Sequence, residues 1–273
     1  RQASGFLQID DIFAMYDRSS PALWHSEMLC HLPYNQNAVF ASFSPSVHVR
    51  ALPGQPSPGA IVQLPADGFT RKFTMENLIA GIDFGWKTFA CLWIAMLRDL
   101  AGNRVAWVLD EYIRHDQILS DHIAALKSRA PAVTETLPEN SSPPLSQFPS
   151  STIPWQTLAY YCDVAGSQHN PHTGLTSLEL LKASGLPVKA RPMNILDGIG
   201  KINTLLAATR FTIPAPRLLI HPRCKSLILA LQSYELKNGL PLKDNIHDHP
   251  LDALRYALVG HDPNPHKLEV RYY

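Results

Sequence analysis

Two acidic residues of this chain stand where an apolar, strand-like run of sequence ends. Asp83 closes the run NLIAGID between Gly81 and Gly85, and Asp163 closes the run LAYYCD. A carboxylate without a partner is costly to bury, so such an acid is usually paired, shifted in pKa or bound to a metal. The alternative for Asp83 is an ordinary tight turn, because Asp and Gly are common turn residues. The two acids therefore predict either turns or a shared cation site.

A third acidic group opens the last predicted helix, HPLDALRYALVG. Pro250 favours the first helical position, so we expect His249 as the N-cap and Asp252 in the first turn. Asp248 and His249 precede Asp252 by four and three residues, a spacing that puts all three on one face if the helical turn starts early enough. The alternative is that Asp252 only stabilises the positive end of the helix dipole. Oxygen ligands of this kind suit Mg²⁺ or Mn²⁺.

Apolar periodicity and turn residues predict the elements that would carry these acids. Strands are expected at 77–83, 89–97, 104–113, 155–166, 186–193 and 217–222, the first three as a meander. Helices are expected at 115–130, 175–185, 195–210, 224–236 and 249–260. Strands that alternate with helices indicate a mixed α/β sheet. Regular structure is expected to begin near Asn77, after a helical N-terminal segment and a proline-rich linker, and 131–154 to be a Pro/Ser-rich insertion.

The order of these elements is the layout of a ribonuclease-H-like nuclease, in which acids from the first strand, the fourth strand and a late helix hold two divalent cations. From Ile79 to Gly260 the chain also resembles the C-terminal nuclease domain of the large terminase subunit of tailed bacteriophages, the motor that packages viral DNA and cuts concatemers. The resemblance rests on GIDFGWKTFACLWI, on YYCDVAGSQHNPHTGLTSLELLKASGLPVKAR and most specifically on HPLDALRYAL, which reproduces the family's H-x-x-D-A-L-R-Y helix.

The resemblance implies which residues act. Asp83, Asp163 and Asp252 match the family's metal-binding acids, and His249 matches a histidine beside them. Asp248 matches a position that is acidic in some branches of the family, so it is either a ligand or stands outside the coordination shell. The implied reaction is hydrolysis of double-stranded DNA with two Mg²⁺ or Mn²⁺ ions and little sequence specificity.

Basic residues are expected to contact the DNA. The whole chain has a net charge of +1, but residues 174–246 hold ten Lys and Arg against four Asp and Glu. Such a surplus suits a phosphate backbone, although a solvated surface explains it almost as well. Residues 234–243 are expected to form a β-hairpin around Asn238-Gly239 that guides the duplex. The DNA-binding candidates are Lys182, Lys189, Arg191, Lys201 and Lys237.

The expected organisation is an N-terminal segment at 1–77 that ends a missing ATPase domain, a nuclease domain at 78–262 and a tail at 263–273. The family implies an ATPase domain, the portal and the small terminase subunit as partners in the full protein, and the cytoplasm of the infected bacterial host as its place of action. The isolated domain is expected to be a monomer. We expect no ATP hydrolysis, because no G-x-x-x-x-G-K-[ST] loop occurs, and no membrane span, because no apolar stretch is long enough.

Other classes of function remain open. A resolvase, integrase or transposase would share the acids and the fold, but the H-x-x-D-A-L-R-Y helix argues against it. GIDFGWKT also resembles the first phosphate loop of the actin and Hsp70 ATPases, but CDVAGS is a poor second loop. A DNA-binding module without catalysis would show a basic face without a complete set of acids. His169 and His172 are expected in a polar loop rather than a zinc site. Glu111, at the end of the third strand, is expected to be an ordinary exposed acid, and the alternative is a hydrogen bond into the metal site.

Overall fold

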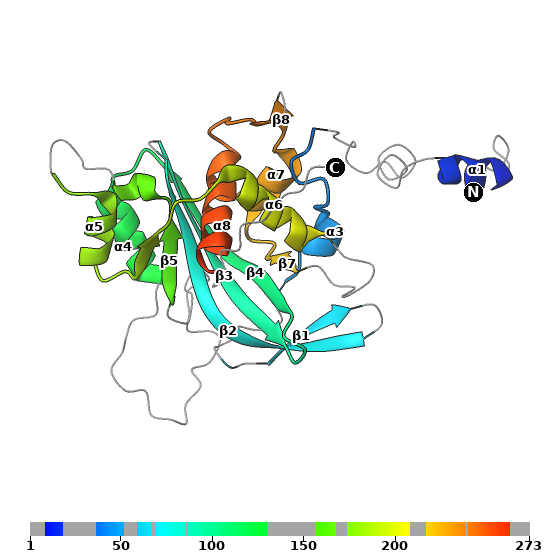
Figure 1. Cartoon of the computed structure of the whole chain (residues 1–273), viewed down its shortest axis with the longest axis horizontal. Coiled ribbons are helices and arrows are strands. Elements are labelled where there is room, and N and C mark those ends of the chain that lie inside the picture. The colour runs from blue at the N-terminus through cyan, green and yellow to red at the C-terminus, as the bar shows by residue number, and fades with distance from the viewer. Residues whose placement is uncertain are drawn as a thin grey trace.

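The computed structural model describes residues 9–18, 37–51, 59, 61–66, 69–85, 87–129, 157–167, 174–207, 217–237 and 240–262. Its centre is a seven-stranded mixed sheet with helices on both faces (Figure 1). The strands of this sheet are β1 (Ile61–Ala66), β2 (Phe69–Phe84), β3 (Thr88–Asp99), β4 (Arg104–His115), β5 (Ala159–Cys162), β6 (Val188–Ala190) and β7 (Leu218–Ile220). A separate two-stranded sheet consists of β8 (Leu236–Lys237) and β9 (Leu240–Pro241). The helices are α1 (Ile9–Arg18), α3 (Pro45–His48), α4 (Leu119–Arg129), the 3₁₀ turn η3 (Val164–Ser167), α5 (Ser177–Ala183), α6 (Ile195–Leu206), α7 (Lys225–Ser233) and α8 (Asp248–Gly260).

Six strands follow one another across the sheet in the order β6-β5-β2-β3-β4-β7, and β1 pairs with the first half of β2. The strands β2, β3 and β4 form the predicted antiparallel meander, and Gly102 takes a positive φ of 85° in the turn before β4. β5 and β6 run parallel to β2 on one side, and β7 runs parallel to β4 on the other. The central strand β3 is buried from Thr88 to Leu97 because both of its faces are covered, which explains its unbroken apolar sequence.

Two hydrophobic cores lie on opposite faces of the sheet. Successive residues of β2 alternate between them: Ile79 packs with α6, α7 and α8, whereas Leu78 and Ile82 pack with α4 and α5. Figure 1 shows the same division, with α4 and α5 on one side of the sheet and α6, α7 and α8 on the other. None of the described helices combines the length and the apolar composition that crossing a membrane requires.

The folded core begins well before Asn77, where the sequence placed the start of regular structure. The strand β1 and the first half of β2 extend the sheet, and residues 37–51 pack against it. Phe40 is buried in the core, and Nε2 of His48 lies 3.1 Å from the carbonyl oxygen of Leu206. Frequent prolines hid these short pieces, but an edge strand such as β1 tolerates proline because one side of its backbone needs no partner. The predicted insertion at 131–154 lies outside the described residues.

Candidate active site

Asp83 and Asp163 lie level with each other at the C-terminal ends of two neighbouring strands, β2 and β5. β2 and β5 run parallel with Ile82 opposite Cys162, so each acid is the next residue along its strand. Neighbouring strands lie about 4.8 Å apart, and alternation puts both acids on the face of the sheet that α8 covers. Oδ1 of Asp163 accepts a hydrogen bond of 2.7 Å from the backbone N–H of Val164. The structure thus brings together two of the acids that the sequence singled out.

Two glycines allow helix α8 to approach β2 at this point. A Cβ atom at Gly81 would overlap the backbone carbonyl oxygen of Ala253, and one at Gly85 would overlap the imidazole of His249. The sequence offered these glycines as turn formers around Asp83. Their main effect is to remove side chains where the helix and the strand meet.

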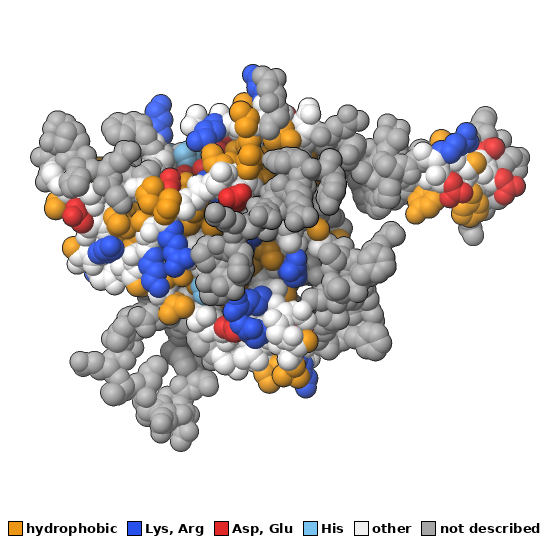
Figure 2. Space-filling view, viewed as in Figure 1, with side chains coloured by type: hydrophobic (Ala, Val, Ile, Leu, Met, Phe, Trp, Pro, Cys, Tyr) orange, Lys and Arg blue, Asp and Glu red, His pale blue; other side chains and the backbone are white. Residues whose placement is uncertain are grey.

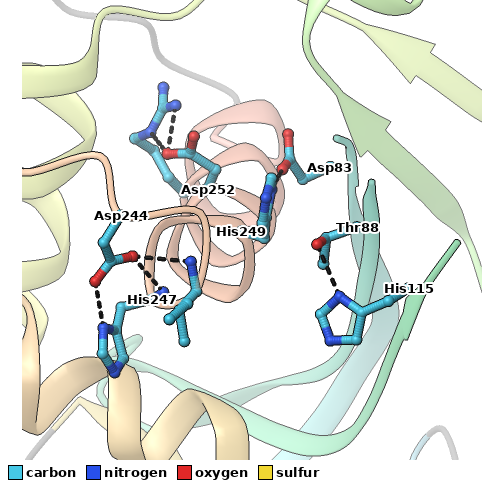
Figure 3. A network of polar contacts seen from close by, with 9 residues as sticks. Asp83, Thr88, His115, Asp244, His247, His249 and Asp252 are labelled. Carbon is cyan, nitrogen blue, oxygen red and sulfur yellow. Dashed lines mark hydrogen bonds and ion pairs between the residues drawn. The ribbon is translucent and has the colours of Figure 1, made fainter. Parts of the chain in front are cut away.

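Helix α8 starts earlier than predicted. It begins at Asp248 with His247 as N-cap, so Asp248 is in the first turn and Asp252 follows one turn later. The carboxylate of Asp244 accepts hydrogen bonds from the backbone N–H groups of Ile246 and His247 at 2.9 and 2.7 Å, an Asx-type turn that leads into the helix (Figure 3). Pro250 does not prevent the earlier start, because N–H groups of the first turn have no intrahelical acceptor. The prediction that His249 is the N-cap was therefore wrong.

The carboxylate of Asp83 is paired with the ring of His249 (Figure 3). Nδ1 of His249 donates to Oδ2 of Asp83 across 2.7 Å, and these side chains are 12% and 15% exposed. Burial raises the pKa of Asp83 despite the hydrogen bond from His249, and the charges of Asp252 and Asp248 add to the rise. The hydrogen bond to Asp83 raises the pKa of His249 in turn. Both shifts favour a proton within the pair.

The carboxylate of Asp252 is paired with a buried arginine on the same helix. Nη2 and Nε of Arg255 lie 2.8 and 3.2 Å from Oδ1 of Asp252. Burial raises the pKa of the adjacent Tyr256 phenol, and the charge of Asp252 raises it further. Asp83 and Asp163 act on the same phenol in the same direction. The three acids therefore lie within electrostatic range of one tyrosine.

Asp248 is buried in the first turn of α8, and its Oδ1 has no hydrogen-bond partner among the described residues. A buried carboxylate oxygen left in this way costs free energy unless a cation or a water molecule meets it. As the side chains stand, no three His, Cys, Asp or Glu residues in the described part of the chain are close enough to share a metal ion. The acids are held by protein partners instead: Asp83 by His249 and Asp252 by Arg255.

Sequence reasoning missed the partner of one acid and misplaced another. Arg255 was visible only as part of a family motif, although its position three residues after Asp252 is the helical spacing at which opposite charges pair. Glu111 was expected to be exposed, but its carboxylate accepts hydrogen bonds of 2.9 Å from the backbone N–H groups of Ser226 and Leu227. Glu111 thus caps the N-terminus of α7 from strand β4.

Two of the predicted DNA-binding residues lie beside the acids. Lys189 is level with Tyr161 on the adjacent strand, and its Nζ lies 6.0 Å from the centre of the tyrosine ring. Arg191, two residues after Lys189, is exposed. It follows Ala190, which is opposite Cys162, so Arg191 is level with Asp163 and on the same face of the sheet.

The other three predicted contacts lie elsewhere. Lys201 on α6 forms an ion pair with Asp262. Lys182 is exposed on α5, a helix that packs on the opposite face of the sheet. Lys237 is exposed on β8, which pairs with β9 as the predicted hairpin, although Asn238-Gly239 lies outside the described residues. Figure 2 likewise shows basic side chains in several separate groups on the visible face.

No protein-family model and no curated protein matches this chain. Solved structures do. Two structures of the large terminase from a thermophilic bacteriophage, one in complex with ATP-γ-S, match 92% of this chain at TM-scores of 0.51 and 0.52 and identities of 16% and 15%. The P22 large terminase nuclease domain matches 82% of this chain and 91% of its own length at a TM-score of 0.50 and 17% identity. The fold is that of a large terminase nuclease domain.

This terminase nuclease fold confirms the ribonuclease-H-like mixed sheet that the sequence predicted. The chain covers 52% of the length of the thermophilic phage terminase, so it spans about half of that protein. The polar loop predicted at His169 and His172 lies outside the described residues.

Proposed function

We propose that this chain is a divalent-metal-dependent endonuclease that cuts double-stranded DNA with little sequence preference, as the nuclease part of a viral DNA-packaging motor. The observation that carries the proposal is the position of Asp83 and Asp163 on adjacent parallel strands under helix α8, whose His249 is hydrogen-bonded to Asp83 and whose Asp252 acts on the pKa of Asp83. The charges of Asp252 and Asp248 help to raise the pKa of Asp83, and a bound cation would relieve that repulsion.

The donor set fits Mg²⁺ or Mn²⁺. All the candidate ligands are carboxylates, the hard oxygen donors that these ions prefer. Asp248 adds a buried oxygen that lacks a partner among the described residues. Asp83, Asp163 and Asp252 would hold two ions, and Asp248 is either a further ligand or stands outside the shell. Ions held there would supply an activated water for attack on a phosphodiester and would stabilise the leaving oxygen.

The protein's own residues orient this site. His249 is hydrogen-bonded to Oδ2 of Asp83, so Oδ1 would be available to a cation. Arg255 is hydrogen-bonded to Oδ1 of Asp252, so Oδ2 would be available in the same way. Lys189 and Arg191 stand on the same face as the acids, where they would contact backbone phosphates. Phosphate contacts position a duplex without reading its bases, which suits an enzyme that must cut many sequences.

The same reasoning extends to the full protein. One matched large terminase was solved in complex with ATP-γ-S, and this chain covers about half of that protein. We therefore propose that an ATPase domain accompanies this nuclease domain, with the portal and the small terminase subunit as further partners.

Supercoiled plasmid tests the proposal directly. The chain is incubated with plasmid in EDTA, Mg²⁺ or Mn²⁺, and nicked and linear products are measured beside an Asp83→Asn variant. We expect cleavage that needs the metal and is lost in the variant. Cleavage in EDTA, or equal cleavage by the variant, would contradict the proposal. A four-way junction cut far faster than a linear duplex would indicate a resolvase instead.

A further inference from the structure

Arg255 occupies an uncommon place for an arginine. Its side chain is 4% exposed, its guanidinium lies 4.6 Å from the centre of the Tyr256 ring, and Nη1 has no partner among the described residues. Arginine is almost never fully buried without a paired charge. Here that charge is Asp252, and both hydrogen bonds go to the same oxygen, Oδ1.

Helix α6 provides the space for this side chain. A Cβ atom at Gly198 would overlap Cγ and Cδ of Arg255, whereas a Cβ atom at Gly200 would meet nothing within 4 Å. Glycine is a poorer helix former than alanine, so a buried glycine within α6 calls for a packing reason. The stem of Arg255 is that reason. Two helices far apart in the sequence thus fix the position of one guanidinium.

We infer that Arg255, seated against Gly198, is a positioning residue that fixes Oδ1 of Asp252 and leaves Oδ2 directed toward the proposed cation site. The inference rests on the proposed nuclease function. A guanidinium suits this task because its planar fork donates two hydrogen bonds at once, which an ammonium group does not do in that geometry. Partners of this kind behind metal ligands are typically worth about 10–100-fold in metal affinity or activity.

A purely structural ion pair makes a different prediction. Removing such a pair would lower the thermal midpoint of the protein but leave the metal concentration needed for half-maximal cleavage unchanged. Arg129 provides the matched control. It is another largely buried arginine, its Nε lies 3.9 Å from a carboxylate oxygen of Asp110, and it packs over the Trp93 ring on the opposite face of the sheet.

The test compares Arg255→Met, Arg255→Lys, Gly198→Ala and Arg129→Met with the wild-type chain. Two quantities are measured: the Mn²⁺ concentration for half-maximal plasmid cleavage, and the rise in thermal midpoint that Mn²⁺ causes without DNA. We expect Arg255→Met to need about 10–100-fold more Mn²⁺ in both measurements. Gly198→Ala should also raise the Mn²⁺ requirement in both measurements, although the charge of Arg255 is kept. The Mn²⁺ requirement of Arg255→Lys should lie between those of the wild type and Arg255→Met. Arg129→Met should lower the thermal midpoint and leave the Mn²⁺ dependence of both measurements unchanged.

Wild-type Mn²⁺ dependence in folded Arg255→Met would overturn the inference. If Arg255→Met does not fold, wild-type Mn²⁺ dependence in both Gly198→Ala and Arg255→Lys would overturn it. Failure of the proposed function looks different. In that case the wild-type chain itself shows no metal-dependent cleavage, or Asp83→Asn cleaves as well as the wild type.

Discussion

Nδ1 of His249 lies 2.7 Å from Oδ2 of Asp83, although 166 positions separate the two residues in the sequence. Asp83 comes from strand β2 and His249 from α8, the last described helix. The contact forms only where α8 lies directly on β2, and Gly81 and Gly85 provide the room for that approach. The proposed site is therefore completed by the C-terminal part of the fold, so its formation reports on the docking of α8.

The first prediction concerns the strand acids. Asp83→Asn and Asp163→Asn should each abolish metal-dependent cleavage and leave the thermal midpoint in EDTA unchanged or slightly higher. Each variant removes one charged oxygen of the proposed metal site, but it also relieves repulsion among neighbouring acids. Asp110→Asn is a matched control, because Asp110 is equally buried on the opposite face of the sheet. Near-wild-type cutting by either site variant would exclude the two-metal assignment.

The second prediction concerns the contact between strand and helix. Gly81→Ala should lower the free energy of unfolding by about 3 kcal/mol or more, because the new methyl group overlaps backbone atoms of Ala253 that have little room to move. Gly200→Ala, in open space on α6, should instead raise it by about 0.5–1 kcal/mol. Urea unfolding of both variants measures the difference. Equal stability of the two variants would mean that α8 does not pack closely on β2.

The sequence predicted the sheet well because its signals are local. Alternating apolar runs marked the meander, and Gly185, with a φ of 90°, ends α5 where the sequence placed the helix end. Acids at the ends of strands β2 and β5 could be found in the same way, because parallel neighbours in this fold bring their ends to one edge.

What the sequence could not predict depends on long-range packing. Nothing next to Glu111 indicates that it caps a helix 115 residues later, and nothing next to Gly198 indicates the stem of Arg255. The start of α8 was misplaced because Pro250 gave a strong local signal, while the turn that begins the helix depends on the side chain of Asp244. Local propensity yields to such contacts when they satisfy more backbone groups.

The third prediction concerns pH and lies away from the proposed metal site. His122 is buried, stacked on Phe89 at 4.2 Å and hydrogen-bonded to Tyr112 across 3.1 Å. Burial lowers the pKa of His122, so the neutral ring is favoured in the folded state. The contribution of neutral His122 to the stability of the fold is complete above about pH 6.5, the pKa of this ring in the unfolded chain. It is lost as pH falls from there through the lower pKa of His122 in the folded protein.

We therefore expect a smaller loss of stability in His122→Gln than in the wild type when pH falls from about 7.5 to about 5. The difference should be about 1.4 kcal/mol for each unit by which the folded pKa lies below the unfolded one. Denaturant unfolding at several pH values measures it. Identical pH dependence in the two proteins would show that His122 does not titrate differently on folding.

The fourth prediction separates the two acids of α8. Asp252→Ala should eliminate cleavage, because it removes a proposed metal ligand, the carboxylate that pairs with Arg255. Asp248→Ala should leave measurable activity, and its stability should not fall, because it removes a buried oxygen that lacks a partner among the described residues. Plasmid nicking with Mn²⁺ compares them. The reverse pattern would make Asp248 the third ligand and leave the nuclease proposal intact.

The fifth prediction concerns the duplex. Binding should be salt-sensitive and independent of sequence, because the contacts are mainly to phosphates. Lys189→Gln and Arg191→Gln should each weaken binding and lower the slope of log affinity against log salt by about 1, since each would remove one proposed phosphate contact near the acids. Lys201→Gln is the control, because Lys201 is already paired with Asp262. Fluorescence anisotropy in Ca²⁺ or EDTA at several salt concentrations measures all three variants. A loss for Lys201→Gln as large as for Arg191→Gln would place the duplex over α6 rather than along β5 and β6.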